Sequence, residues 1–116
     1  MNSKIEIAFT DFEVDGVNIP LAFLYYEGNE ETYITYQNID TDNTFCGDDE
    51  ILGYLLYYDI DIYSKGNYLK IVEKVKEIMK ASGFMWQPSR TSEDMYEENT
   101  KMYHKTLCFA IEKEEE

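Results

Sequence analysis

Few residues in this sequence have the type and spacing that a catalytic or metal-binding site would need, and most of those are carboxylates. Asp59 and Asp61 stand two positions apart in an alternating segment, so both would lie on one face of a strand as paired carboxylates. The sequence supplies no base, nucleophile or ligand set to accompany them. Catalysis through these two residues, with a metal held by Asp48, Asp49 and Glu50, is therefore kept only as an alternative.

Metal-binding and nucleophilic motifs are missing from the sequence. Segment 40–51 is acidic, but an EF-hand loop needs Gly at its sixth position and Glu at its twelfth, where Phe45 and Ile51 stand. His104 is the only histidine and no CxxC pair occurs, so a zinc site would lack ligands. No GxGxxG, P-loop, GxSxG or HExxH motif occurs. We expect no enzyme activity, no cofactor and no metal, and a structural or surface role for His104.

The two cysteines, Cys46 and Cys108, each stand next to a phenylalanine. Free cysteine is among the most buried residue types. Two well-separated cysteines also do not make a disulfide framework in a chain of this size. We expect both to be buried free thiols.

Charge is the strongest signal in the sequence, and it is unevenly placed. Among the 116 residues, 24 are acidic and 10 are basic, which gives a formal net charge of −14. Residues 1–64 contain 14 of the acids and a single base, whereas residues 65–116 contain 10 acids and 9 bases. Such a charge repels phosphate and anionic lipid. The two parts are either solvated surfaces or two unlike faces that make a head-to-tail contact and close into a ring.

Hydrophobic periodicity predicts the elements that would position these residues. Residues 1–19 are expected to be a strand-rich arm with a small hairpin at Asp15-Gly16. The next strands are predicted at 21–26, 32–39 and 51–63. The first two of them, which follow Pro20, are expected to form a hairpin, and residues 40–50 are predicted to be a loop.

The second half of the chain has the clearest periodicity. Residues 68–82 predict an amphipathic helix, with Asn67 as N-cap, Gly83 as C-cap and lysines opposite an apolar stripe. A short strand at 84–86 and one helical turn at 93–95 are expected after it. The packed face of the strand at 51–63 would consist of Tyr58, Ile60 and Ile62, and that of a final strand at 103–112 of Leu107, Phe109 and Ile111.

This order of strands, one helix and further strands predicts an α+β domain. We expect two layers, in which a mostly antiparallel sheet packs against one long amphipathic helix. Residues 1–116 would form a single domain, with a frayed acidic tail at 113–116. No apolar run is long enough to cross a membrane, and the first residues lack the apolar segment of a secretory signal.

The run from Asp59 to Tyr68, DIDIYSKGNY, is followed by the lysine-rich helix and Gly83-Phe84. Further segments of the same pattern are Pro20–Tyr36, Met95–Glu98, Thr100 and Tyr103–Lys105. Together they resemble the small tail-completion proteins of long-tailed phages and prophages, which are tail-terminator or tail-to-head joining proteins. The resemblance covers about residues 19–112. Members of this family often begin with an amphipathic helix, whereas residues 1–19 are expected here to be strand-like.

The resemblance implies a non-enzymatic structural protein of the virion, located in the tail and neck and made in the cytoplasm of the bacterial host. Members of the family form a ring, commonly a hexamer, that ends the tail tube and joins it to the neck below the head. The implied partners are other copies of the chain, the major tail tube protein and a head-completion or neck protein. Genomic DNA would pass through the ring without specific binding, and no membrane is involved.

The charged residues are the candidate contacts in such a ring. The lysines of the predicted helix and the turn before it would form a basic face between subunits, which comprises Lys65, Lys70, Lys74, Lys76 and Lys80. Acids of two predicted loops would face the lumen or a partner, and these are Glu27, Glu30, Glu31, Asp40, Asp42, Asp48, Asp49 and Glu50. The alternative is a small acidic DNA mimic that inhibits a basic nuclease or DNA-binding protein. In a mimic, acids would follow helix or strand faces rather than cluster in loops.

Overall fold

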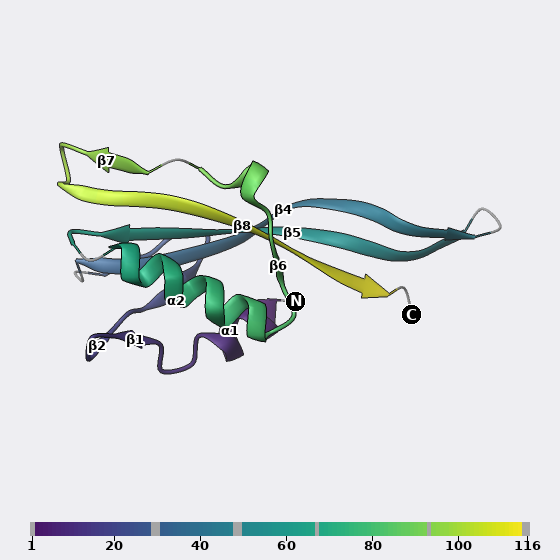
Figure 1. Cartoon of the computed structure of the whole chain (residues 1–116), viewed down its shortest axis with the longest axis horizontal. Helices are drawn as coiled ribbons and strands as arrows, with labels where there is room; N and C mark the ends of the chain where they lie inside the picture. The colour runs from purple at the N-terminus through teal and green to yellow at the C-terminus, as the bar shows by residue number, and fades with distance from the viewer. Residues whose placement is uncertain (1, 29–30, 48–49, 67, 93, 115–116) are drawn as a thin grey trace.

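A computed structural model describes residues 2–28, 31–47, 50–66, 68–92 and 94–114. Within them the chain is a mixed α+β structure with one sheet of several strands, a small second sheet and two α-helices (Figure 1). The mixed α+β class predicted from the sequence is confirmed. The expectation of a single long helix is not, because a helix of 7 residues precedes the one of 14 residues.

Three long strands form the centre of the main sheet. β4 (Thr32–Gly47) pairs antiparallel with β5 (Glu50–Ser64), and β5 pairs antiparallel with β8 (Met102–Glu114). The short strands β6 (Met85–Trp86) and β7 (Met95–Glu97) both add to β8. The described sheet therefore ends at the short strands β6 and β7 on one side and at β3 (Leu21–Phe23), the neighbour of β4, on the other.

The strands predicted at 51–63, 84–86 and 103–112 are confirmed by β5, β6 and β8. The helical turn expected at 93–95 is wrong, because Met95 begins β7, and Glu93 lies outside the described residues. A single helical turn lies earlier, as the 3-10 helix η1 (Pro88–Arg90). Pro88 fits the start of that turn, where its missing N–H costs no hydrogen bond.

The predicted loop at 40–50 is wrong, because β4 continues to Gly47 and β5 begins at Glu50. Asp and Asn are depleted in strands, so the composition of this segment indicated a loop. Pairing with the apolar start of β5 overrides that preference, and the register is irregular at bulges such as the one after Asn38. The described residues of segment 39–54 project beyond the body in Figure 1. We call this segment the hairpin arm.

β3 (Leu21–Phe23) pairs with β4 in parallel, which corrects the predicted hairpin. The chain turns sharply after Phe23, where Leu24 has a φ of 70° and the Tyr25 N–H donates to the Phe23 carbonyl at 2.9 Å. The Leu24 N–H donates to the Tyr36 carbonyl at 3.0 Å, which fixes the end of β3 against β4. This tight turn at a non-glycine residue carries no sequence signature.

The start of the chain is helical rather than strand-like. α1 (Asn2–Ala8) begins a segment whose buried side chains, Ile5, Phe9 and Phe12, are four and three positions apart. That spacing belongs to a helix, and Ile7, which completed the apparent alternation, is 73% exposed. The predicted strand at the very start is therefore wrong.

The small hairpin predicted at Asp15-Gly16 is confirmed. β1 (Glu13–Val14) and β2 (Val17–Asn18) pair antiparallel around these two residues. Both have positive φ, 53° for Asp15 and 80° for Gly16, as a two-residue hairpin turn with the right-handed strand twist requires.

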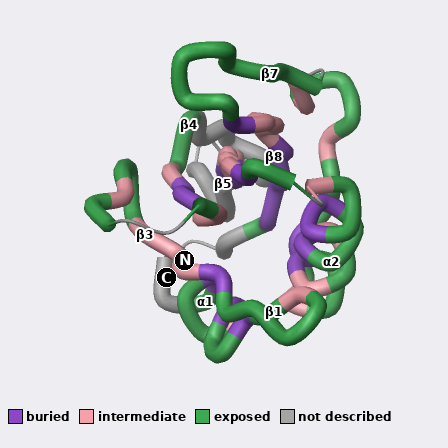
Figure 2. The backbone as a smooth tube through the Cα atoms, turned by 90° about the vertical axis from the view of Figure 1, so that its left-hand side faces the viewer, coloured by how far each residue is buried: buried purple, intermediate pink, exposed green. Residues whose placement is uncertain are grey.

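α2 (Tyr68–Ala81) places the predicted apolar stripe against the sheet, where it buries Ile71, Val72, Val75 and Met79. In Figure 2 the buried stretches of this helix face the strands and its exposed stretches face away. The helix ends at Gly83, whose φ is 92°. The Phe84 N–H donates to the Met79 carbonyl at 3.0 Å and the Gly83 N–H to the Lys80 carbonyl at 3.1 Å, as in a Schellman cap. Asn67, the predicted N-cap, lies outside the described residues.

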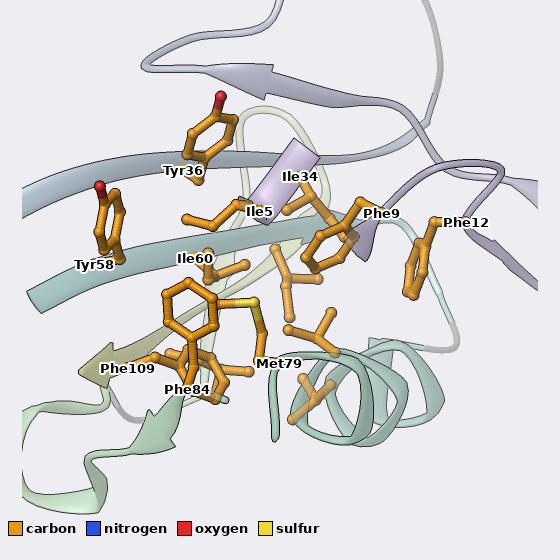
Figure 3. Packing of buried hydrophobic residues seen from close by; sticks show 14 of the residues in the cluster. Ile5, Phe9, Phe12, Ile34, Tyr36, Tyr58, Ile60, Met79, Phe84 and Phe109 are labelled. Carbon is orange, nitrogen blue, oxygen red and sulfur yellow. The ribbon is translucent and has the colours of Figure 1, made fainter. Parts of the chain in front are cut away.

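The core lies between the sheet and the two helices (Figure 3). Every residue predicted for the packed faces of β5 and β8 is buried: Tyr58, Ile60, Ile62, Leu107, Phe109 and Ile111. Cys108 and Ala110 on the other face of β8 are also buried. The segment around η1 lies along this strand, because the Gln87 N–H donates to the Cys108 carbonyl at 2.8 Å. Cys108 is a buried free thiol as predicted, whereas the side chain of Cys46 lies outside the described part.

Candidate functional site

The sheet face opposite the core carries a polar cluster that no sequence motif indicated. The register of β5 and β8 places Thr106 opposite Asp61, and His104 two residues away on the same face. The His104 Nε2 atom lies 3.3 Å from the Asp61 Oδ1 atom, and the Thr106 hydroxyl donates to the same carboxylate oxygen. The cluster depends on pairing between segments more than 40 residues apart, with separations of 43 and 45 residues. Sequence spacing alone therefore could not reveal it.

The geometry of this cluster does not match that of a catalytic triad. In a triad the acid and the nucleophile contact different nitrogens of the imidazole ring. Here the Thr106 hydroxyl lies 3.4 Å from the His104 Nε2 atom, the same nitrogen that faces Asp61. The arrangement instead joins β5 to β8 through a shared carboxylate. It supports the structural role predicted for His104.

Asp59, the other member of the predicted carboxylate pair, lies in a poorly solvated position. Burial, with a smaller contribution from the neighbouring charge of Asp61, raises the pKa of Asp59 to about 6, and Arg90 partly offsets the rise. Burial also raises the pKa of the Cys108 thiol to about 11, so this thiol is protonated and unreactive at neutral pH. The pair Asp59 and Asp61 is thus held on a half-buried face rather than in a cleft.

Replacing Asp59 with asparagine is expected to stabilise the fold at neutral pH by about 1 kcal/mol. Because of the raised pKa, the Asp59 carboxyl stays protonated to a higher pH in the folded state than in the unfolded state, over the range from about pH 4 to about pH 6. The free energy of unfolding of the parent protein therefore falls across that window and stays low above it. The D59N variant does not show this fall, because asparagine does not ionise. Urea unfolding across the window measures it, with exposed Glu77→Gln as control. Parallel pH profiles for D59N and the parent would refute this assignment.

Two series of aromatic contacts lie at the end of the sheet near the turn from β5 to α2. Tyr26, Tyr33, Tyr63 and His104 stack in succession, with ring centroids 4.6, 4.7 and 4.2 Å apart. Tyr96, Tyr103 and Tyr68 form the second series, with centroids 5.0 and 4.9 Å apart. The second series joins the first residue of α2 to β8 and β7. These contacts fix the start of α2, and therefore the lysines that follow it.

The turn between β5 and α2 is fixed by Ser64, which is fully buried. The Ser64 hydroxyl accepts from the Gly66 N–H at 3.1 Å and lies 3.1 Å from the Thr32 hydroxyl of β4. This local bonding closes the turn and leaves Lys65 exposed at its tip. Lys65 is 3.8 Å from Glu31.

The structure separates the lysines of the predicted basic face into exposed ones and one that is engaged within the chain. Lys70 is exposed and lies 3.2 Å from Asp15 of the small hairpin, and Lys74 and Lys80 are exposed as well. Lys76 is different, because its Nζ atom lies 4.0 Å from the centre of the Trp86 ring and 3.6 Å from Glu73. That ammonium is engaged within the chain by a cation–π contact and an ion pair. It is therefore a weak candidate for an inter-subunit contact.

Lys65 and Lys70 line one groove together, at the start of α2. The groove has a volume of about 480 Å³ and is lined by Lys65, Gly66, Tyr68, Leu69, Lys70 and Tyr103. Among the described residues its lining contains two ammonium groups, two phenol rings and no carboxylate, although the Asp94 carboxyl forms a hydrogen bond with the Tyr68 side chain. Leu69 in this lining is 62% exposed. We call it the Tyr-Lys groove. A depression beside it shares Leu69 and Lys70, but it is also lined by Lys74 and by the carboxylates Asp15, Glu73 and Glu77, so its acids outnumber its lysines.

The acids predicted to face a lumen or partner fall in three places. Glu27 and Glu31 are exposed in the segment between β3 and β4. Asp40 and Asp42 belong to β4 and Glu50 to β5, so they are strand residues of the hairpin arm rather than loop residues. The side chains of those three lie outside the described part, as do Glu30, Asp48 and Asp49 altogether.

Neither a metal cluster nor a membrane span occurs in the part of the chain described above. No group of three or more His, Cys, Asp or Glu side chains there has the arrangement of a metal site. No helix among those residues combines the length and the apolar character needed to cross a bilayer. Comparison with protein-family models gave no match, and neither did comparison with curated proteins.

Proposed function

We propose that this protein is a structural component of a long-tailed phage virion, a ring-forming protein that ends the tail tube and joins it to the neck below the head. The observation that carries the proposal is the hairpin arm, which projects at one end of an α+β body (Figure 1). The Tyr-Lys groove is lined by residues of the turn from β5 into α2, which lies towards the other end. Unlike surfaces at opposite ends suit a head-to-tail contact, and such contacts close into a ring when the rotation between successive copies allows it. The resemblance of residues 19–112 to tail-completion proteins supplies the biological setting.

Further features support this proposal. α1 supplies the N-terminal helix that many tail-completion proteins have, and its absence was the one difference expected from the sequence. The antiparallel pairing of β4, β5 and β8 and the buried stripe of α2 support a two-layer domain packed against an amphipathic helix. A strongly acidic subunit would also form a channel wall that does not retain DNA.

The partners in this proposal are other copies of the chain, the major tail tube protein and a head-completion or neck protein. β3 and β6 end the strand order of the described sheet, so each offers an edge to which a strand of a partner could add. DNA would pass through the ring without specific binding. The proposed role is non-enzymatic, without cofactor or metal, in the tail and neck of a particle assembled in the bacterial host.

Light scattering after size exclusion, together with electron microscopy of tail tubes, tests the proposal. We expect a ring of several subunits, with six as the expected number, or a monomer that assembles when it caps the end of a tube. Capped tubes should stop growing when fresh tube protein is added. A stable monomer or dimer that leaves tube ends uncapped would contradict the proposal.

The DNA-mimic alternative gains one supporting observation. Asp40 and Asp42 alternate along a strand instead of lying in a loop, and a mimic needs acids that follow a strand or helix. The same scattering experiment separates the two functions, because a mimic would remain a small oligomer. It would also bind a basic nuclease or DNA-binding protein in competition with DNA.

A further inference from the structure

The molecule is elongated, and two surfaces of unlike composition lie towards opposite ends of it. Its extents are 53 × 27 × 24 Å. Figure 1 shows the hairpin arm at one end of the long axis and the turn from β5 into α2 at the other. The Tyr-Lys groove is built around that turn. A copy of the chain therefore presents each surface once, and the two surfaces point away from each other.

The hairpin arm has the composition of a segment that binds a basic and partly apolar surface. Segment 39–54 contains five acids, no lysine, arginine or histidine, and several large apolar residues. Its apolar members are Ile39, Phe45, Cys46, Ile51, Leu52 and Tyr54. Ile39, where the arm leaves the body, is 42% exposed. A paired segment that combines carboxylates with apolar side chains is suited to contact both ammonium groups and aromatic rings.

The Tyr-Lys groove is complementary to that composition. Lys65 and Lys70 supply positive charge in its lining, while Tyr68, Leu69 and Tyr103 supply apolar contact. The ion pairs that these lysines make within the chain join exposed groups, with side-chain exposures of 47% and 74% for Lys65 and Glu31, and 67% and 50% for Lys70 and Asp15. Exposed pairs of this kind contribute roughly 0–1 kcal/mol. They can therefore be exchanged for carboxylates of a partner at little cost.

We infer that the hairpin arm of one copy docks in the Tyr-Lys groove of the next copy. Charge complementarity and the placement of the two surfaces at opposite ends identify the occupant as a second copy of this chain. Because the contact joins unlike surfaces, each added copy leaves one arm and one groove for the next. This inference rests on the proposed function, and it specifies which surfaces hold the ring together.

Cysteine cross-linking tests this contact with one native thiol, Cys46, and one introduced thiol. Cys46 lies in the hairpin arm, and Cys108 is buried with a raised pKa, so it should not react in the folded protein. The variant Leu69→Cys adds a thiol at an exposed position in the groove. A short bismaleimide should then link Cys46 of one copy to position 69 of the next and produce a ladder of covalent oligomers. The parent protein and the variant L69C with Cys46→Ser should give no ladder.

The outcomes separate this inference from the proposed function. A ladder that requires both thiols supports arm-in-groove docking. A ring by light scattering without that ladder would overturn the docking and leave the ring-forming function intact. Linkage that persists in the L69C variant with Cys46→Ser would indicate a symmetric groove-to-groove contact and would also overturn the docking. A parent protein that neither assembles nor caps tubes would overturn both, and circular dichroism of each variant confirms that it is folded.

Discussion

Replacing Phe109 with alanine is expected to lower the free energy of unfolding by about 3–5 kcal/mol, which is a large part of the total stability of a small domain. Phe109 is fully buried on β8, opposite Tyr58 of β5 and opposite Trp86 of β6. Its ring lies in the core near Phe84 and Met79 (Figure 3). Strands on both sides hold the backbone, so the cavity left by the ring cannot collapse easily.

Urea unfolding followed by circular dichroism measures this loss, at one protein concentration because assembly also stabilises the folded state. Phe23→Ala is the matched control, since it removes the same side chain from a position that is 48% exposed. Phe23 contacts Tyr36, with ring centroids 5.3 Å apart, so its removal is expected to cost about 1 kcal/mol or less. Equal losses in the two variants would show that β8 does not lie at the centre of the core.

The part of the fold that could be predicted is the part encoded by local periodicity. Burial of Tyr58, Ile60 and Ile62 follows from alternation along one strand, and the stripe of α2 follows from helical spacing. Gly83 ends the helix because an adjacent positive φ is needed there, and a glycine supplies it. Each of these signals involves residues within one element, so no knowledge of the partner strand is required.

The sequence-based predictions that were wrong concern segments whose structure depends on contacts with other elements. The hairpin arm contains residues that disfavour strands, and only its register with β5 makes them strand residues. The direction of β3 depends on the turn at Leu24, which has a positive φ. A leucine rarely adopts such a φ, so the residue type does not predict this turn. At the start of the chain, Ile5 and Phe9 fit both a strand and a helix, and the burial of Phe12 decides for the helix.

The candidate site was predictable in its charges but not in its shape. The sequence placed lysines on the exposed side of α2, and the structure agrees for Lys70, Lys74 and Lys80. The groove, however, needs Tyr103 of β8 beside Tyr68 of α2, a contact that the tertiary fold alone creates. The contact between Trp86 and Lys76 is likewise created by the tertiary fold, and it engages the Lys76 ammonium within the chain.

The groove changes the interpretation of the net charge of −14. A uniformly acidic subunit would repel its own copies and resist assembly. Here the described strands of the hairpin arm and the Tyr-Lys groove lie towards opposite ends of the chain. In the inferred contact, the acidic sequence of one copy therefore meets the lysines of the next copy. Long-range repulsion between subunits remains and is screened by salt, whereas docked pairs are partly shielded from it.

Reversing both groove lysines, as K65E with K70E, is expected to weaken assembly by about tenfold to a hundredfold. The change places two carboxylates where the acidic arm of a neighbour would dock, so attraction becomes repulsion at the same positions. The effect should be larger at low salt, because the Debye length is then longer. Sedimentation velocity over a range of protein concentrations measures the shift in assembly.

The control variant has the same net charge as K65E with K70E, but its reversed lysines lie outside the groove. K74E with K80E reverses two exposed lysines of the same helix that do not line the Tyr-Lys groove, so it should assemble nearly as well as the parent. Adding Asp48→Lys and Asp49→Lys to the K65E and K70E chain should restore assembly, because a basic arm then meets an acidic groove. Equal loss in the two lysine pairs would mean that total charge, and not docking in the groove, governs assembly.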